Sequence, residues 1–314
     1  MAILSVVIPA FNAEKYVGEC IESVLRQPGY KGNVELLVVI DGATDGTESV
    51  VRRVAGNDDS VRVFVQERMG ASASRNLGLA HARTEYVTFL DADDSWSKDY
   101  LQVILPLLSE GPDLIEYDAE LVSEDGRPQG TLKIASAPSG AGPMDIGPEE
   151  FLGIFRCYAW ARVCRTDIAS THSFPDGRRF EDCATTPWYY WASRRTVSMG
   201  KALVVYRQHP ASVLATPLPS DVAEICEAIS ESARMYVETK AWYWRLATYR
   251  IFHFACQRTS MLPLLAWPGN LRRARALVSG VPRPPGFRRW LQARATLAYV
   301  AILAVKRALA WNRG

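Results

Sequence analysis

Short apolar runs alternate with amphipathic segments through the first hundred residues of this chain. Continuous apolar runs at Ile3–Ile8 and Val34–Ile40 are typical of strands that are buried on both faces. Further strands are predicted at Val61–Gln66 and Tyr86–Leu90. Because helices are predicted between these strands, the expected fold class is α/β, with a mostly parallel sheet flanked by helices. In such a sheet, ligands bind beyond the carboxyl ends of the strands.

The helices between the strands are marked by capping residues and by small residues. Asn12 is predicted to cap a helix over Glu14–Arg26, and Asp45 to cap a helix over Thr47–Val54. The segment Gly70–Ala82 is rich in small residues and is predicted to form a third helix. The chain therefore begins with the repeated strand–helix units that a parallel sheet requires.

The alternation becomes looser after residue 99. Ser123–Pro148 is rich in Gly, Pro and Ser and predicts a hairpin or a long loop. A helix is predicted to begin in Glu149–Phe155 and a short strand to span Ala202–Tyr206, and helical patterns dominate from Ser220 onward, broken by prolines. We expect a boundary near residues 215–220. The predicted domains are residues 1–215, in two halves at 1–99 and 100–215, and residues 220–314.

Composition excludes several classes of site. Hydrophobic residues make up 48% of the chain and charged residues 22%, which are ordinary globular values. The six cysteines include no C-x-x-C pair, which argues against a zinc ribbon and a disulfide scaffold and favours a reducing compartment. With four histidines and no H-E-x-x-H motif, a metal site built from histidines is not expected.

Charge is distributed unevenly. Residues 241–314 contain 13 of the 36 Lys and Arg residues and none of the 34 Asp and Glu residues, together with five of the nine tryptophans. Basic residues interleaved with Trp and Leu favour binding to an anionic membrane surface. A helical subdomain docked on the acidic body is the first alternative, and a nucleic-acid-binding segment is the least favoured.

The sequence predicts no membrane-spanning helix. Its best apolar run, Ala295–Val305, has 11 residues, and a spanning helix needs roughly 20. Ile3–Ile8 has no basic residue before it and is followed by Pro9, so it predicts a strand and not a signal peptide. We therefore expect a cytoplasmic protein that is peripheral on the inner face of the cytoplasmic membrane.

Acidic residues follow two of the predicted strands. Asp41 comes directly after the second strand, and Asp91, Asp93 and Asp94 follow the fourth. Acids beside a buried strand are costly unless a cation neutralises them, and carboxylate oxygens suit Mg²⁺ or Mn²⁺. A capped helix start is the alternative for Asp93 and Asp94.

Other residues near the strand ends suit a nucleotide. The Asp41 carboxylate can accept the imide N–H of uracil, and Pro9 and Phe11 offer an apolar wall for a base. Arg75 lies on the predicted helix that leads into the fourth strand, where it can clamp a phosphate. A solvated helix arginine is the alternative for Arg75.

Four motifs resemble those of the family 2 nucleotide-sugar glycosyltransferases of the GT-A type. They occur in the expected order within the first 96 residues and read V-V-I-P-A-F-N, L-V-V-I-D-G-A-T-D-G-T, G-A-S-A-S-R-N-L-G and V-T-F-L-D-A-D-D-S-W. The resemblance covers about residues 1–215 and implies a GT-A, Rossmann-like fold. It also implies an inverting transferase that uses a nucleotide-diphosphate sugar and Mn²⁺ or Mg²⁺. Residues 1–99 would bind the donor, and residues 100–215 the acceptor.

The resemblance assigns roles to single residues. It implies that the nucleoside base of the donor binds at Pro9, Ala10, Phe11 and Asp41. It also implies further donor contacts from Arg75, Asp91 and Ala92, and metal ligands at Asp93, Asp91 and His209. Members often carry two acids, D-D-G-S, where this chain reads Ile40-Asp41-Gly42-Ala43. We take Asp41, the one acid that remains, to be the one that contacts the nucleoside base.

Later segments resemble the acceptor half of the family. Glu181-Asp182 matches its E-D motif, in which a carboxylate is the catalytic base. Asp182 is assigned as the base and Glu181 as its acceptor-binding or structural partner, and the reverse assignment stays open. Trp160 is a candidate for stacking on the acceptor sugar, with a core position as the alternative. Arg207, which precedes His209, is a second candidate for acceptor binding.

Other classes of protein fit the sequence less well. A phosphatase of the haloacid-dehalogenase type would use the first Asp of D-x-D as nucleophile, but it usually carries that motif early in the chain. A membrane-surface protein that binds nucleotide-sugar without turnover would not need the acids at 93 and 182. We therefore predict transfer of a sugar, most simply from UDP, to a glycan or lipid-linked glycan of a bacterial surface polysaccharide or lipopolysaccharide.

Overall fold

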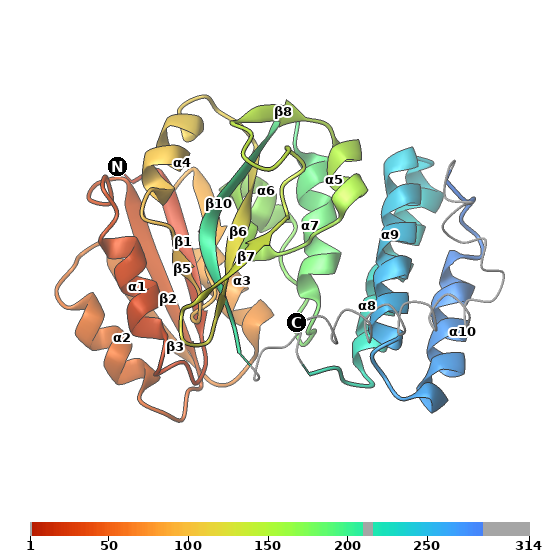
Figure 1. Cartoon of the computed structure of the whole chain (residues 1–314), viewed down its shortest axis with the longest axis horizontal. Helices are drawn as coiled ribbons and strands as arrows, with labels where there is room; N and C mark the ends of the chain where they lie inside the picture. The colour runs from red at the N-terminus through yellow and green to blue at the C-terminus, as the bar shows by residue number, and fades with distance from the viewer. Residues whose placement is uncertain (1, 210–215, 285–314) are drawn as a thin grey trace. The chain divides into compact units, whose positions relative to one another are not determined.

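The computed structural model describes residues 2–209 and 216–284, and the chain divides into two compact units, Met1–His209 and Pro210–Gly314. In the first unit, helices flank a single sheet, so the predicted α/β fold class is confirmed (Figure 1). The strand order is β3-β2-β1-β4-β9-β6-β10-β5, with β7 beside β6 and β8 beside β10.

The sheet is mostly parallel. Six of its strands run in one direction, namely β1 (Leu4–Ala10), β2 (Val34–Asp41), β3 (Val61–Gln66), β4 (Tyr86–Phe89), β6 (Leu114–Ser123) and β10 (Thr196–Gln208). The other four run in the opposite direction, namely β5 (Ser95–Trp96), β7 (Pro128–Leu132), β8 (Met144–Ile146) and β9 (Arg162–Arg165). The predicted Ser123–Pro148 hairpin or loop contains β7 and β8.

The helices of this unit pack on both faces of the sheet. They are α1 (Val17–Leu25), α2 (Thr47–Ala55), α3 (Ala71–His81), α4 (Tyr100–Leu108), α5 (Pro148–Ile154), α6 (Thr166–Thr171) and α7 (Glu181–Ala192), with a 3₁₀ turn at Ala159–Ala161. Val6 joins the core cluster that contains the apolar face of α1. Val7 points to the other face, where a Cβ on Gly78 of α3 would lie 2.3 Å from it. This glycine therefore allows α3 to lie directly against β1.

One helix start differs from the prediction. Asn12 does not cap α1, which begins at Val17. Asn12 has a φ of 45°, and its side-chain oxygen accepts a hydrogen bond from the backbone N–H of Thr44 at 2.8 Å. Asp45 does bond to the first turn of α2, where its carboxylate accepts the backbone N–H of Thr47 at 3.0 Å. Both side chains thus shape the edge of the sheet that carries the acids.

The described part of the second unit, residues 216–284, is helical, as predicted, and contains α8 (Asp221–Thr239), α9 (Trp242–Thr259), a 3₁₀ turn at Leu264–Ala266 and α10 (Trp267–Val278). Pro268 lies in the first turn of α10, where its missing N–H costs no helical hydrogen bond. No helix in the described segments is both long and apolar enough to cross a bilayer. The apolar run Ala295–Val305 lies outside the described residues.

Candidate active site

The predicted site residues gather at one edge of the sheet. Strands β1, β2 and β4 are parallel and adjacent, so their carboxyl ends bring Phe11, Asp41 and Asp91 to the same edge. Strand β10 runs in the same direction and ends at Gln208, which places His209 at this edge as well. The topology therefore supports the predicted position of the site beyond the strand ends.

Arg75 joins the two halves of the first unit. From α3, one terminal nitrogen donates to Asp91 Oδ1 at 2.7 Å, and the other donates to Glu181 Oε1 at the start of α7. Burial alone would lower the pKa of Arg75, but the charges of Asp91 and Glu181 raise it above its usual value. Two donor groups of this arginine are thus already used by carboxylates, and only its Nε–H has no partner within the described residues.

The next residue, Asn76, makes a second connection between the halves. Its side-chain amide donates to the backbone oxygen of Phe174 at 2.8 Å and accepts the Phe174 N–H at 2.9 Å. The Phe174 ring lies 5.4 Å from the Arg75 guanidinium. This positioning role of Asn76 was not predicted, although the R-N dipeptide of the third motif contains the residue.

The acids at the start of α7 have different surroundings. Glu181 is buried and bonded to Arg75, whereas Asp182 has no salt bridge within the described residues. Burial, and then the charge of Glu181, raises the pKa of Asp182 to about 7. Burial also raises the pKa of Glu181, against the opposing charge of Arg75. A carboxylate with a pKa near neutrality is suited to accept a proton from a hydroxyl.

Asp93 and His209 form a pair at the strand ends. His209 Nε2 lies 2.7 Å from Asp93 Oδ2, and the His209 ring stacks on Tyr16 with a centroid separation of 5.7 Å. Burial and the nearby charge of Asp91 raise the pKa of Asp93, while the bond to His209 opposes this effect. Within the described residues, no three His, Cys, Asp or Glu side chains converge into a metal site. Mg²⁺ and Mn²⁺ need only one or two carboxylates when substrate phosphates supply the other oxygens, so this pair fits such an ion.

Asp41 is occupied by donors from the protein itself. One carboxylate oxygen accepts the Gln66 amide at 2.8 Å and the Met69 N–H at 2.7 Å, and the other accepts the Arg68 guanidinium at 3.0 Å and the Gly70 N–H at 2.8 Å. Burial would raise the pKa of Asp41, but these bonds lower it. In this structure Asp41 fixes the turn between β3 and α3, and its predicted contact with a nucleotide base stays a prediction.

The Arg68 guanidinium lies over the ring of Phe11. The Arg68 guanidinium lies 3.2 Å from the ring centroid of Phe11, which is itself 40% exposed. Pro9 and Ala10 form the end of β1 directly before this ring, and Ala92 is buried between Asp91 and Asp93. One face of the Phe11 ring is thus covered by Arg68, and the predicted wall for a nucleotide base stays a prediction. Arg68 was not among the predicted site residues, because its position is set by a contact with Asp41, 27 residues earlier in the chain.

Trp160 belongs to the core. It is only 3% exposed and stacks on Tyr206, with 5.1 Å between the ring centroids. The ring of Tyr158 also contacts it, with 5.0 Å between the centroids. A ring that is covered in this way has no free face for a sugar. The acceptor-stacking role predicted for Trp160 is therefore corrected to a packing role.

Arg207 is also a structural residue. Its buried guanidinium donates to the backbone oxygens of Asp93 and Glu124, at 3.2 and 3.0 Å, and to the Glu19 carboxylate at 2.8 Å. Its backbone N–H donates to the buried Asp94 at 2.9 Å. These four bonds tie the end of β10 to the D-x-D segment, and the acceptor-binding role of Arg207 stays a prediction.

Comparison with known proteins places this arrangement in a family. The profile of "Glycosyl transferase family 2" matches residues 5–163. Glycosyltransferase GlyG of Streptococcus pneumoniae is 26% identical over 68% of this chain and 73% of its own length. The minor teichoic acid biosynthesis protein GgaA of Bacillus subtilis is 36% identical over 32% of this chain and 23% of its own length.

Among solved structures, the fold resembles residues 1–349 of S. aureus TarS, crystallised in complex with UDP-GlcNAc. The TM-score is 0.77 at 20% sequence identity, and the match covers 98% of this chain and 92% of the TarS chain. This similarity confirms the GT-A fold. Because the family profile spans half of the sequence and includes all four motifs, the chain belongs to glycosyl transferase family 2 and is a glycosyltransferase.

Proposed function

We propose that this protein is an inverting transferase that moves a sugar from a nucleotide diphosphate, most simply UDP, to a hydroxyl of a glycan or lipid-linked glycan. The product would be a bacterial surface polysaccharide or lipopolysaccharide, made at the cytoplasmic side of the membrane. The observation that carries this proposal is the contrast at the start of α7. Glu181 is paired with Arg75, whereas the adjacent Asp182 has no salt bridge within the described residues and a pKa raised to about 7 by burial and by the charge of Glu181.

In this proposal Asp182 accepts the proton of the attacking acceptor hydroxyl. The hydroxyl oxygen attacks the anomeric carbon from the face opposite the diphosphate, so one bond forms as the other breaks and the configuration inverts. Glu181 and Arg75 position this carboxylate by fixing the start of α7 to the end of β4. Membership in the family sets aside the phosphatase alternative, which needs a nucleophilic Asp91.

The donor would lie along the strand ends. Pro9, Ala10 and Phe11 would form the wall against the base, and Arg75 and Asp91 would lie beside the diphosphate. Asp93 and His209, with Asp91 alongside, would hold Mn²⁺ or Mg²⁺. When bound, such an ion supplies positive charge to the departing diphosphate.

Calorimetric titration with UDP, in the presence and absence of Mn²⁺, tests the donor assignment. We expect metal-dependent binding by the wild type and a clear loss of affinity in Asp93→Asn. The matched control is Asp99→Asn, because Asp99 is an exposed acid that pairs with Lys201 away from the site. Failure to bind UDP or any other nucleoside diphosphate would overturn the proposal. Binding without turnover of any nucleotide-sugar, across a panel of acceptors, would favour the binding-protein alternative.

A further inference from the structure

Two adjacent leucines are exposed at the turn that joins α9 to α10. Leu264 is 71% exposed and Leu265 is 97% exposed, and both lie in the 3₁₀ turn Leu264–Ala266. Among the large hydrophobic side chains of the described residues, these two are the most exposed. Neither belongs to the glycosyltransferase motifs, so the proposed reaction gives no reason for their exposure.

The turn is built so that these leucines point outward. Leu262, just before the turn, is buried, and so is Trp267, just after it. The Trp267 indole N–H donates to the backbone oxygen of Leu262 at 2.9 Å, and the Ala266 N–H donates to the Pro263 oxygen at 2.9 Å. These two hydrogen bonds and the two buried side chains fix the conformation of the turn, and in this conformation Leu264 and Leu265 are exposed.

Positive charge lies close to this turn. Arg272, Arg273 and Arg275 are exposed on α10, and residues 241–284 contain no Asp or Glu. At 1.5 Å per residue, Arg272 lies roughly 8 Å along the helix from Trp267. Helix α8, which packs against α10, carries the five acids of residues 216–284, namely Asp221, Glu224, Glu227, Glu231 and Glu238, against nine Lys and Arg residues in the same range, so these residues keep a net positive charge. Asp221 is buried and paired with Arg258 at 2.5 Å.

We propose that the α9–α10 turn is a membrane anchor, with Leu264 and Leu265 inserted at the boundary between headgroups and acyl chains of an anionic bilayer. Apolar anchors of this kind enter to a depth of about 5–10 Å. That depth brings the arginines of α10 to the level of the lipid phosphates, where each contributes to binding. Two leucines are too small an apolar area for a stable protein interface, which buries about 800 Å² on each partner. Charge and size together therefore favour lipid as the occupant.

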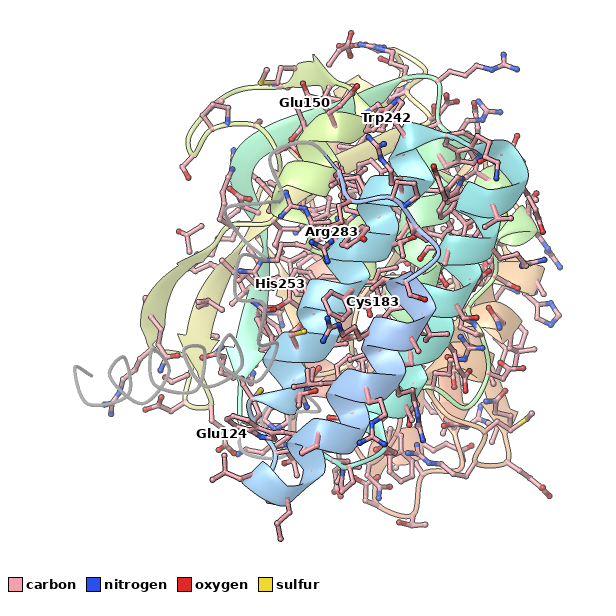
Figure 2. All side chains as sticks on the ribbon, turned by 90° about the vertical axis from the view of Figure 1, so that its right-hand side faces the viewer. Glu124, Glu150, Cys183, Trp242, His253 and Arg283 are labelled. Carbon is pink, nitrogen blue, oxygen red and sulfur yellow. The ribbon has the colours of Figure 1, made fainter. Side chains whose placement is uncertain are left out.

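Flotation of the full chain with vesicles tests this anchor. We expect binding to vesicles of equal parts phosphatidylcholine and phosphatidylglycerol, and little binding to phosphatidylcholine alone. The double variant Leu264→Ser/Leu265→Ser should bind more weakly by about a hundredfold or more, given the usual transfer energy of two leucines. The matched control is Val237→Ser, because Val237 is an exposed apolar residue of the same unit near the other end of α9. Figure 2 labels Trp242 at the start of α9 and His253 further along the same helix, toward the turn.

A dye reports insertion independently of affinity. All six cysteines are buried, so an environment-sensitive dye attached to Leu265→Cys marks the turn, and one on Val237→Cys serves as the reference. We expect a blue shift on vesicle addition at position 265 and none at position 237. Equal binding by the double serine variant with no shift at 265 would show adsorption through the arginines alone and would overturn the proposal. Loss of self-association in that variant, without any effect on vesicles, would instead identify the turn as a protein interface.

Discussion

Asp41 and Asp182 are both acids that the sequence marks for the site, yet their surroundings are opposite. Asp41 accepts four hydrogen bonds from the protein, and its pKa is lowered. Asp182 has no salt bridge within the described residues, and its pKa is raised to about 7. The supply of donors, and not the residue type, therefore decides which acid holds the fold and which can take up a proton.

The largest effect is expected for Asp182→Asn. Removing a general base slows the chemical step by about 10²–10⁴-fold. The affinity for UDP should stay unchanged, because Asp182 is placed on the acceptor side of the reaction. Single-turnover release of UDP from the donor measures the first quantity and calorimetry the second. If the rate of Asp182→Asn stays within a few fold of the wild type, another group must be the catalytic base.

Glu181→Gln separates the two adjacent acids. Removing one partner of a buried ion pair typically costs about 3–5 kcal/mol, so the free energy of unfolding should fall by an amount in this range. Because the charge of Glu181 raises the pKa of Asp182, its loss should also move the pH dependence of transfer to lower pH. Urea denaturation and a pH–rate profile test the two effects, and a shift to higher pH would contradict the assignment.

Asp41→Asn tests the structural acid. The variant loses part of a set of charged hydrogen bonds, and we expect a cost of about 2 kcal/mol at neutral pH. Since folding lowers the pKa of Asp41, its stabilising effect is complete above the unfolded value and disappears as the pH falls through the folded value. Thermal melts of wild type and variant should therefore converge only in strong acid. Convergence near neutral pH would show that the Asp41 charge is not stabilising.

Arg68→Ala carries the smallest expected effect. If Arg68 occupies the place of a stacked base, its removal should tighten UDP binding by about two- to fivefold, which corresponds to the usual strength of an exposed cation–π contact. Calorimetry with UDP measures the change. Weaker binding would mean that Arg68 contacts the nucleotide, and Asp41 would then act through Arg68.

Much of the fold followed from the sequence because its first strands are continuous apolar runs. Strand β6 escaped prediction because it carries two buried acids, Glu116 and Asp118. Their oxygens accept bonds from the backbone N–H groups of residues 134–136 and from Tyr190, so the charges are satisfied by segments distant in the chain. Strand β10 spans 13 residues, of which the sequence predicted only the apolar Ala202–Tyr206. Local pattern shows which residues are apolar, but not which polar residues will find partners.

The site shows the same limit. The motifs identified Arg75, Asp91 and Glu181, but they did not indicate that Arg75 would bond both to Asp91, 16 residues later, and to Glu181, 106 residues later. The motifs also could not show whether Trp160 packs in the core or stacks on a sugar, because both roles need an aromatic ring. Contacts between distant segments set the role of each of these side chains.

The pH dependence of donor turnover by the wild type tests the central claim most directly. With Asp182 as the base, kcat/KM should rise about tenfold for each pH unit below about 7 and level off above it, because the carboxylate must be ionised to accept the proton. The same rise should be absent from the residual activity of Asp182→Asn. A profile that is flat through neutrality in the wild type, or unchanged in the variant, would contradict the account.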